Sequence, residues 1–234
     1  DLAKCQVEVG AVADALISVD RMLALSPKNI RYYHFKENLL LDMKDFEKLV
    51  ATADLAILVS KTDDYSYFMK GRAAEGLNNL SLSENLFMKA IELALSDKLK
   101  KDNISILYPY YQNLADVQKK LFKNQAAVLN YSKAIAMNPS DLNSLNNRGV
   151  VYFEMKDLPA ASADFTKGIS LNSKNPDAFY WRARVNQQMG QFASAISDYN
   201  QAIIIDDKRP EYLIGRAECY FTTPDFSSAG RDDK

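Results

Sequence analysis

Apolar residues recur every three or four positions along nearly the whole chain. Ala127, Tyr131 and Ala134 show the spacing, which places apolar side chains on one face of an α-helix. Glycines and prolines fall mostly between such stretches, as in "MNPSD" and "SKNPD", where they favour turns. No stretch alternates between apolar and polar residues as a half-buried strand does. The pattern predicts an all-α protein of short helices joined by tight turns.

The apolar pattern repeats itself at an offset of 34 residues. Residues 142–175 align with 176–209, with Gly149 over Ala183, Ala161 over Ala195, Phe165 over Tyr199, Gly168 over Ala202 and Ile169 over Ile203. Within a single domain 1–234, the predicted units are 1–29 (partial), 30–63, 64–97, 108–141, 142–175, 176–209 and 210–234 (incomplete). A ten-residue insertion, "KLKKDNISIL" (98–107), interrupts the period.

These units resemble the tetratricopeptide repeat family, whose repeat is a pair of antiparallel helices of about 34 residues. The resemblance covers essentially the whole chain. It implies an all-α, right-handed superhelical solenoid of six to seven helix pairs, with small residues at positions eight, twenty and twenty-seven. Positions two, five, six, nine and twelve of each first helix then form a stripe along the concave, ligand-binding surface. Glu37 and Leu49 depart from the small-residue positions, so we expect unit 30–63 to pack less regularly.

The stretch "DAFYWRAR" (177–184) contains three consecutive aromatic residues. Successive side chains on a helix are turned by about 100°, so Phe179, Tyr180 and Trp181 cannot share one face. We expect Phe179 to pack inside its repeat and Arg184 to lie between Tyr180 and Trp181 on the concave stripe. Such an arginine suits a peptide with an apolar anchor and an acidic group. The alternative is that Trp181 packs on the neighbouring unit and Arg184 is only solvated.

Other units contribute polar and aromatic side chains to the same stripe. The predicted peptide-binding groove consists of Asn113, Asn143, Asn146, Asn147, Tyr180, Trp181, Arg184, Arg72, Phe68 and His34. Asn113 and Asn147 occupy equivalent sixth positions. An asparagine amide both donates and accepts hydrogen bonds, so it can read a peptide backbone without reading side chains.

Some members of the family grip the terminal carboxylate of a partner with a clamp of lysine, asparagine and arginine. At the clamp positions this chain carries Gln112, Asp116, Asn147, Asp177 and Trp181. Only Asn147 matches, so a chaperone-tail ligand is disfavoured.

Arginine and aspartate recur together in the later units. Arg148, Arg182 and Arg216 stand at the seventh position, and Asp164, Asp198 and Asp232 stand at the twenty-third. The earlier units lack both partners. Because a guanidinium can hold a carboxylate through two parallel hydrogen bonds, we predict structural ion pairs. They join either the two helices of one unit or adjacent units.

Composition and charge narrow the function classes. The chain is 47% hydrophobic and 25% charged with a net charge of −1, which is typical of a folded, soluble protein and gives no electrostatic footprint for nucleic acid or an anionic membrane. No apolar run is long enough to cross a bilayer. Cys5 and Cys219 are far apart, so we expect two buried thiols rather than a disulfide. Of cytoplasm and periplasm, we favour the cytoplasm.

Signatures of enzymes and metal sites are missing from the sequence. There is no phosphate-binding loop, dinucleotide fingerprint, HExxH or nucleophile elbow, and His34 is the single histidine. We therefore predict no catalytic residue, no cofactor and no metal. The expected function is a non-catalytic protein–protein interaction scaffold that binds an extended peptide or protein segment in its concave groove. The alternative is a structural module that forms homo-oligomers.

Two further expectations concern the insertion and the end of the chain. We expect 98–107 to lengthen the preceding helix and the connection after it, since ten residues cannot bury a core. Leu213, Ala217 and Tyr220 begin a last unit without its full second helix. We therefore expect the natural protein to continue beyond Lys234, or the residues after about Phe226 to be frayed.

Overall fold

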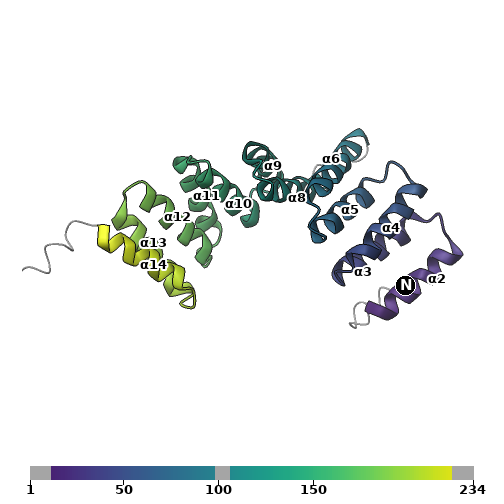
Figure 1. Cartoon of the computed structure of the whole chain (residues 1–234), viewed down its shortest axis with the longest axis horizontal. Helices are drawn as coiled ribbons and strands as arrows, with labels where there is room; N and C mark the ends of the chain where they lie inside the picture. The colour runs from purple at the N-terminus through teal and green to yellow at the C-terminus, as the bar shows by residue number, and fades with distance from the viewer. Residues whose placement is uncertain (1–11, 98–105, 223–234) are drawn as a thin grey trace, which may run out of the picture. The chain divides into compact units, whose positions relative to one another are not determined.

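The computed structural model describes residues 12–97 and 106–222, and within these ranges all regular structure is helical (Figure 1). The chain divides into two compact units, residues 1–123 and 124–234. The first unit contains α2 (Val12–Leu25), α3 (Ile30–Asp42), α4 (Phe46–Val59), α5 (Asp64–Gly76), α6 (Leu80–Ser96) and α8 (Leu107–Lys120). The second contains α9 (Asn124–Met137), α10 (Leu142–Glu154), α11 (Leu158–Leu171), α12 (Pro176–Gln188), α13 (Phe192–Ile205) and α14 (Pro210–Thr222).

Short polar side chains start most of the helices. Asp157, for example, accepts a hydrogen bond from the backbone N–H of Ala160 at 3.2 Å, and Asp141 accepts from those of Asn143 and Ser144. These caps satisfy backbone donors that have no partner within the helix. Asn29, Asp45, Asp63, Asn79 and Asn175 do the same for α3, α4, α5, α6 and α12. Local sequence therefore fixes where the helices begin.

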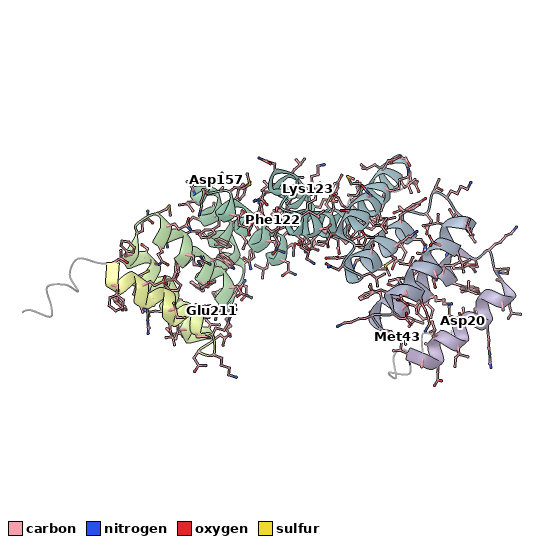
Figure 2. All side chains as sticks on the ribbon, in the orientation of Figure 1. Asp20, Met43, Phe122, Lys123, Asp157 and Glu211 are labelled. Carbon is pink, nitrogen blue, oxygen red and sulfur yellow. The ribbon has the colours of Figure 1, made fainter. Side chains whose placement is uncertain are left out.

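Five first helices end in a residue with a left-handed backbone. These residues are Lys44, Asn78, Phe122, Lys156 and Gly190, with φ between 56° and 74°. They recur every 34 positions, except that the ten-residue insertion widens the spacing between Asn78 and Phe122 to 44. After α3, the N–H of Lys44 donates to the Leu41 carbonyl and the N–H of Asp45 to that of Leu40, so the turn satisfies carbonyls at the helix end. Phe122 is the bulkiest residue with this backbone, and its side chain is 84% exposed (Figure 2).

Small residues allow the two helices of a repeat to cross closely. A Cβ atom on Gly71 would lie 2.6 Å from the Phe87 ring, and one on Gly149 would lie 2.8 Å from the Phe165 ring. Both rings are fully buried. Each α10–α11, α12–α13 or α5–α6 pair packs as one repeat, and each repeat packs on the next within its unit. The predicted all-α array of sequential helix pairs is thus confirmed.

The predicted arginine–aspartate pairs are present in two repeats. Arg148 donates through Nε and Nη2 to Asp164 at 2.8 and 2.7 Å, and Arg182 holds Asp198 in the same way. The remaining Nη1 of Arg148 reaches Ser132 in the preceding second helix at 2.8 Å. The ion pair therefore lies within a repeat, and a hydrogen bond from the same arginine ties that repeat to its predecessor. Asp232, the predicted partner of Arg216, lies outside the described residues.

The helix before the insertion is extended. α6 has 17 residues, against 14 in α4, α9, α11 and α13, and most of the insertion lies outside the described residues. After it, α8 packs against α5 and α6. The Tyr110 hydroxyl donates to buried Asp64 at 3.0 Å, and Gln118 donates to Glu84 at 3.2 Å. These polar contacts hold α8 to the preceding repeat.

The last described helix is only partly covered. Leu213 is 44% exposed and Ala217 is exposed, whereas their counterparts Phe179 and Ala183 are buried. The expectations about the residues after Phe226, and about Cys5, concern residues outside the described ranges. Cys219 is buried, as predicted.

Candidate functional site

Arg184 on α12 has an unusual environment for a charged side chain. Its guanidinium carbon lies 5.2 Å from the ring centroid of Phe153, 5.3 Å from that of Trp181 and 5.9 Å from that of Tyr180. Within the described residues it forms no hydrogen bond or ion pair. Aromatic rings attract a cation through their faces but accept none of its five N–H bonds in the way a carboxylate does. Arg184 is therefore held in place with its donors available.

The three consecutive aromatic residues point to three different neighbours. Phe179 is buried in a cluster with α13 and α14 residues, as predicted. Tyr180 packs against the rings of Tyr199 and Tyr212, at centroid distances of 6.2 and 5.2 Å. Trp181 packs on the preceding repeat, against Phe153 at 5.6 Å and Phe165 at 6.4 Å.

The half-buried Trp181 thus follows the alternative in which it packs on the neighbouring unit. Its contact with a ligand remains a prediction. Together, the rings on both sides of Arg184 link three successive repeats and fix the place of its charge.

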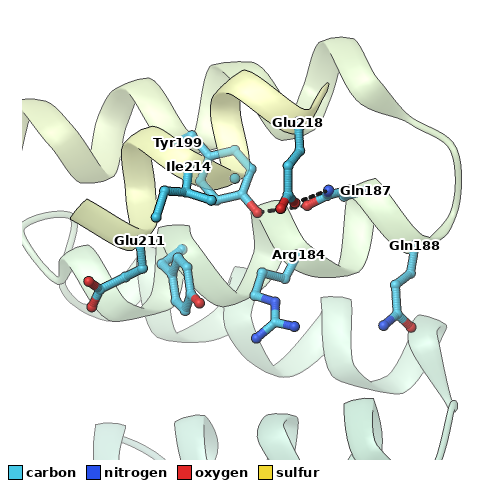
Figure 3. Close-up of a pocket in the computed structure, with 9 residues that line it drawn as sticks. Arg184, Gln187, Gln188, Tyr199, Glu211, Ile214 and Glu218 are labelled. Carbon is cyan, nitrogen blue, oxygen red and sulfur yellow. Dashed lines mark hydrogen bonds between the residues drawn. The ribbon is translucent and has the colours of Figure 1, made fainter. Parts of the chain in front are cut away.

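A pocket of about 400 Å³ lies beside Arg184 (Figure 3). It is lined by Tyr180, Arg184, Gln187, Gln188, Tyr199, Glu211, Ile214, Gly215 and Glu218, from α12, α13 and α14. The two glutamates already have partners, because Gln187 donates to Glu218 at 3.0 Å and Arg209 donates to Glu211 at 2.9 Å. Among the described residues, Arg184 is therefore the charged side chain of this lining that has no hydrogen-bond partner.

The floor of this pocket is rigid and uncharged. The Tyr199 hydroxyl donates to Gln187 at 2.9 Å. Burial raises the pKa of Tyr199 well above its usual value and raises the pKa of Tyr212 to about 12, so both phenols stay neutral at physiological pH. A Cβ atom on Gly215 would lie 2.4 Å from the Tyr199 ring. Only glycine at this position lets α14 come this close to α13.

The predicted asparagines are used unequally. Asn113 donates to the Pro109 carbonyl of its own helix at 2.7 Å. The Oδ1 atom of Asn146 is buried without a hydrogen-bond partner in the described residues, about 3.0 Å from where a Cβ on Gly168 would stand. Asn143 is exposed and Asn147 is half-buried. Asn113 therefore has one of its two amide N–H donors occupied within its own helix.

The predicted residues of the first unit need one correction. Phe68 is only 6% exposed, and it stacks on Tyr110 at a centroid distance of 4.4 Å and packs on Phe87. It belongs to the core, because α8 covers the side of α5 that the sequence stripe leaves open. His34 is hydrogen-bonded to Asp63 at 2.9 Å.

Arg72 stands at the same ninth position as Arg184, on α5. It lines a second pocket of about 560 Å³ together with Leu41, Asp42, Lys44, Phe46, Glu75, Gly76 and Lys120. Like Arg184, it has no hydrogen bond or ion pair with described residues. Each compact unit thus carries an arginine at the ninth position of a first helix that has no hydrogen-bond partner among the described residues.

The sequence reasoning missed the α14 side of the Arg184 pocket. Glu211, Ile214, Gly215 and Glu218 occupy positions two, five, six and nine of the last unit, which are the stripe positions used for the other repeats. Continuing the stripe into the incomplete unit finds them. Phe153, the third ring around Arg184, stands at position twelve of unit 142–175, so it also lies on the stripe although it was not among the predicted groove residues.

The described ranges hold no group of histidine, cysteine, aspartate and glutamate side chains that could bind a metal ion. Among the helices of these ranges, none combines the length and apolar character that a membrane span requires.

Known proteins place this architecture in a wider context. The model of the tetratricopeptide repeat family matches residues 65–97, 108–141, 142–175 and 176–209, which is more than half of the chain. No curated protein sequence matches the chain.

Solved structures resemble the fold at low sequence identity. YrrB, described as a protein with an unusual peptide-binding site, has a TM-score of 0.73 at 17% identity, with 85% of this chain and 97% of that chain covered. MamA (41-end) from Desulfovibrio magneticus RS-1 has a TM-score of 0.67 at 13% identity, covering 77% and 96%. The Cut9–Hcn1 hetero-tetramer has a TM-score of 0.68 at 13% identity, with 93% of this chain and 41% of that chain covered. At these identities the similarity shows the fold alone.

Proposed function

The chain belongs to the tetratricopeptide repeat family, and we propose that it is a non-catalytic scaffold that binds an extended segment of a partner protein. The observation that carries this proposal is Arg184, a cation fixed by three rings and without a hydrogen-bond acceptor in the part of the chain that the structure describes. Holding a guanidinium in one place removes much of the entropy cost of using it. A ligand therefore finds a preorganised donor.

The chemistry of the pocket favours an acidic residue next to an apolar one. A guanidinium matches a carboxylate through two parallel hydrogen bonds. Ile214 is 58% exposed beside it, and Tyr180 adds part of an aromatic face. The volume of about 400 Å³ lies within the usual range for ligand pockets, roughly 300–1,000 Å³. YrrB, whose structure is described by its peptide-binding site, supports this class of ligand by analogy.

A random peptide library selected against the chain tests the proposal. We expect enrichment of peptides with Asp or Glu beside an apolar residue. Arg184→Ala should weaken their binding at least tenfold in fluorescence anisotropy, which is the loss of about 1.4 kcal/mol expected when a charged hydrogen bond is removed. Arg184→Lys should recover only part of the affinity. Lys167→Ala, an exposed charge on α11, is the matched control. Equal binding by Arg184→Ala would contradict the proposal.

A second candidate function is self-assembly, and one surface favours it. Leu55 and Leu58 on α4 are 52% and 74% exposed. In two other repeats the equivalent positions hold Lys89 and Glu92, or Lys167 and Ser170, whereas unit 176–209 has Gln201 and Ile204 there. Light scattering across a concentration series separates the two functions, since a dimer that dissociates on dilution supports assembly. A monomer at all concentrations rejects it.

A further inference from the structure

Glu37 is a carboxyl group at a position where the other repeats have a small residue. The eighth position of the later full repeats holds Gly71, Ala115, Gly149 and Ala183. The Glu37 side chain is 0% exposed. Burying a carboxylate without a compensating partner is strongly unfavourable, so this departure calls for an explanation.

The position facing it in the repeat has changed in the opposite direction. The twenty-fourth position holds Phe87, Tyr131, Phe165 and Tyr199 in those repeats but Ala53 in unit 30–63. In two of them, the aromatic ring packs directly on the glycine at position eight. Unit 30–63 thus exchanges a small residue and a ring for a carboxyl group and a small residue. The exchange conserves bulk, but it places an ionisable group inside the repeat.

The surroundings of Glu37 do not neutralise it. Neither carboxylate oxygen has a hydrogen-bond partner within the described residues, and the nearby Ser66 hydroxyl is buried without one as well. His34 on the same helix and Asp63 before α5 act on it, and they are hydrogen-bonded to each other. Glu37 in turn acts on Tyr65 of α5, whose hydroxyl donates to Asn38. On α2 and α4, the helices on either side of α3 along the chain, Asp20 and Asp54 are paired with Lys36 and Lys70.

In these surroundings the pKa of Glu37 lies close to neutral pH. Burial raises the pKa of Glu37 from 4.5 to about 7, while Ser66 and His34 lower it in part and Asp63 raises it. Asp63 itself behaves in the opposite way. Its burial raises its pKa, but hydrogen bonds from His34 and Ser66 outweigh burial, so the pKa of Asp63 is lowered. Of the two carboxyl groups, Glu37 therefore takes up a proton first as the pH falls.

We propose that Glu37 is a proton-sensitive switch for the packing of unit 30–63, which is tight when the carboxyl is protonated and loosened when it ionises. The fold as described suits the neutral form, since a protonated carboxyl can be buried at a much smaller cost than a carboxylate. Ionisation draws the group toward water, and α3 must separate from α4 and α5 for water to reach it. The switch needs no ligand and is independent of the proposed function.

The sign of the effect follows from linkage. Since the folded-state pKa is raised above the unfolded value of 4.5, the folded repeat binds the proton more tightly. Stability from this group is complete below about pH 4.5, decreases as the pH rises, and is lost above about pH 7. Between about pH 5 and pH 8 the folding equilibrium should change roughly 50- to 100-fold through Glu37 alone.

Hydrogen exchange of α3 tests the switch in the whole chain. After correction for intrinsic exchange rates, α3 amides should open roughly 50-fold more often at pH 8 than at pH 5. Glu37→Gln, which has the same shape and no charge, should abolish this difference. Glu154→Gln, an exposed carboxyl at the end of α10, should leave it intact. Equal pH dependence of α3 opening in the natural chain and in Glu37→Gln would overturn the proposal.

A second measurement needs no substitution. The carboxyl carbon of Glu37, followed by NMR between about pH 4 and pH 9, should titrate close to pH 7. Titration near 4.5 would show that the group is hydrated, and the switch would be rejected even if Glu37→Gln failed to fold.

Discussion

Units 30–63 and 142–175 have the same helix lengths and the same turn after the first helix, yet their interiors follow opposite rules. In 142–175, Gly149 receives the ring of Phe165, and Arg148 and Asp164 form a bidentate pair beside it. In 30–63, position eight holds the buried Glu37, which has no hydrogen-bond partner within the described ranges, and position twenty-four holds Ala53 instead of a ring. The family model matches unit 142–175 but not unit 30–63, because its first match begins at residue 65. The two units therefore keep the same backbone geometry with different residues inside the repeat. The proposed consequence for unit 30–63 is a stability that depends on pH.

Removing the ring from the regular unit should have the largest effect. Phe165→Ala leaves a cavity over Gly149 and should lower the free energy of unfolding by about 3–5 kcal/mol. Urea unfolding followed by circular dichroism measures it. A cost below about 1 kcal/mol would mean that the helices collapse onto the cavity, and that the ring is less important to this unit than the contact suggests.

Restoring the regular chemistry in the irregular unit should sharpen the comparison. Glu37→Ala combined with Ala53→Phe places a ring on a small residue, as in the other repeats. At about pH 8 we expect a gain of roughly 2–3 kcal/mol, because the cost of the ionised carboxyl is removed, and a smaller gain at about pH 5. Thermal unfolding at both pH values checks this. Ala53→Phe alone is the control and should destabilise the chain by overpacking.

The arginine–aspartate pairs, which unit 30–63 lacks, should contribute less to stability than the ring. The pair of unit 176–209 is equivalent to that of unit 142–175 and provides the test. A double-mutant cycle with Arg182→Ala and Asp198→Ala should give a coupling energy of about 0.5–3 kcal/mol. Asp198 also accepts a hydrogen bond from Asn186 at 3.0 Å, which lessens the penalty when the arginine is removed. Strictly additive single substitutions would show that the recurrence of these residues has no energetic basis.

The smallest effect is expected at the exposed surface of α4. Leu58→Lys should change the free energy of unfolding by less than about 0.5 kcal/mol, because the side chain is 74% exposed. A larger loss would show that Leu58 is covered in solution. The molar mass measured by light scattering on the same samples tells whether a second copy provides that cover.

The sequence predicted the repeat fold because the period is visible in the identities of the residues themselves. It also predicted the pairing of Arg148 and Arg182 with aspartates, since these residue types recur together. The exposure of single side chains was harder to predict from the sequence. The stripe gives the angle of Phe68 around its helix, but whether that angle faces solvent depends on Tyr110, which comes from beyond the insertion.

Glu37 shows the same limit in another form. Its departure from the small-residue pattern is evident in the sequence, whereas its complete burial depends on Ala53 and on the approach of α5. The direction of Trp181 depended on which of two neighbouring repeats offered the better aromatic surface. In each case the missing information is the identity of a neighbour in space.

The contacts between helices described earlier also determine how the chain acquires its structure. Helices of each unit contact the next helix along the chain or the one after it, so the sequence separation between partners is short. Short separations keep the entropy of loop closure small and favour rapid folding. In a chain emerging from the ribosome, each repeat can dock onto the one before it without waiting for distant segments. Unit 30–63 emerges before the repeats that follow it, so the pH during synthesis then sets how firmly those repeats can dock onto it.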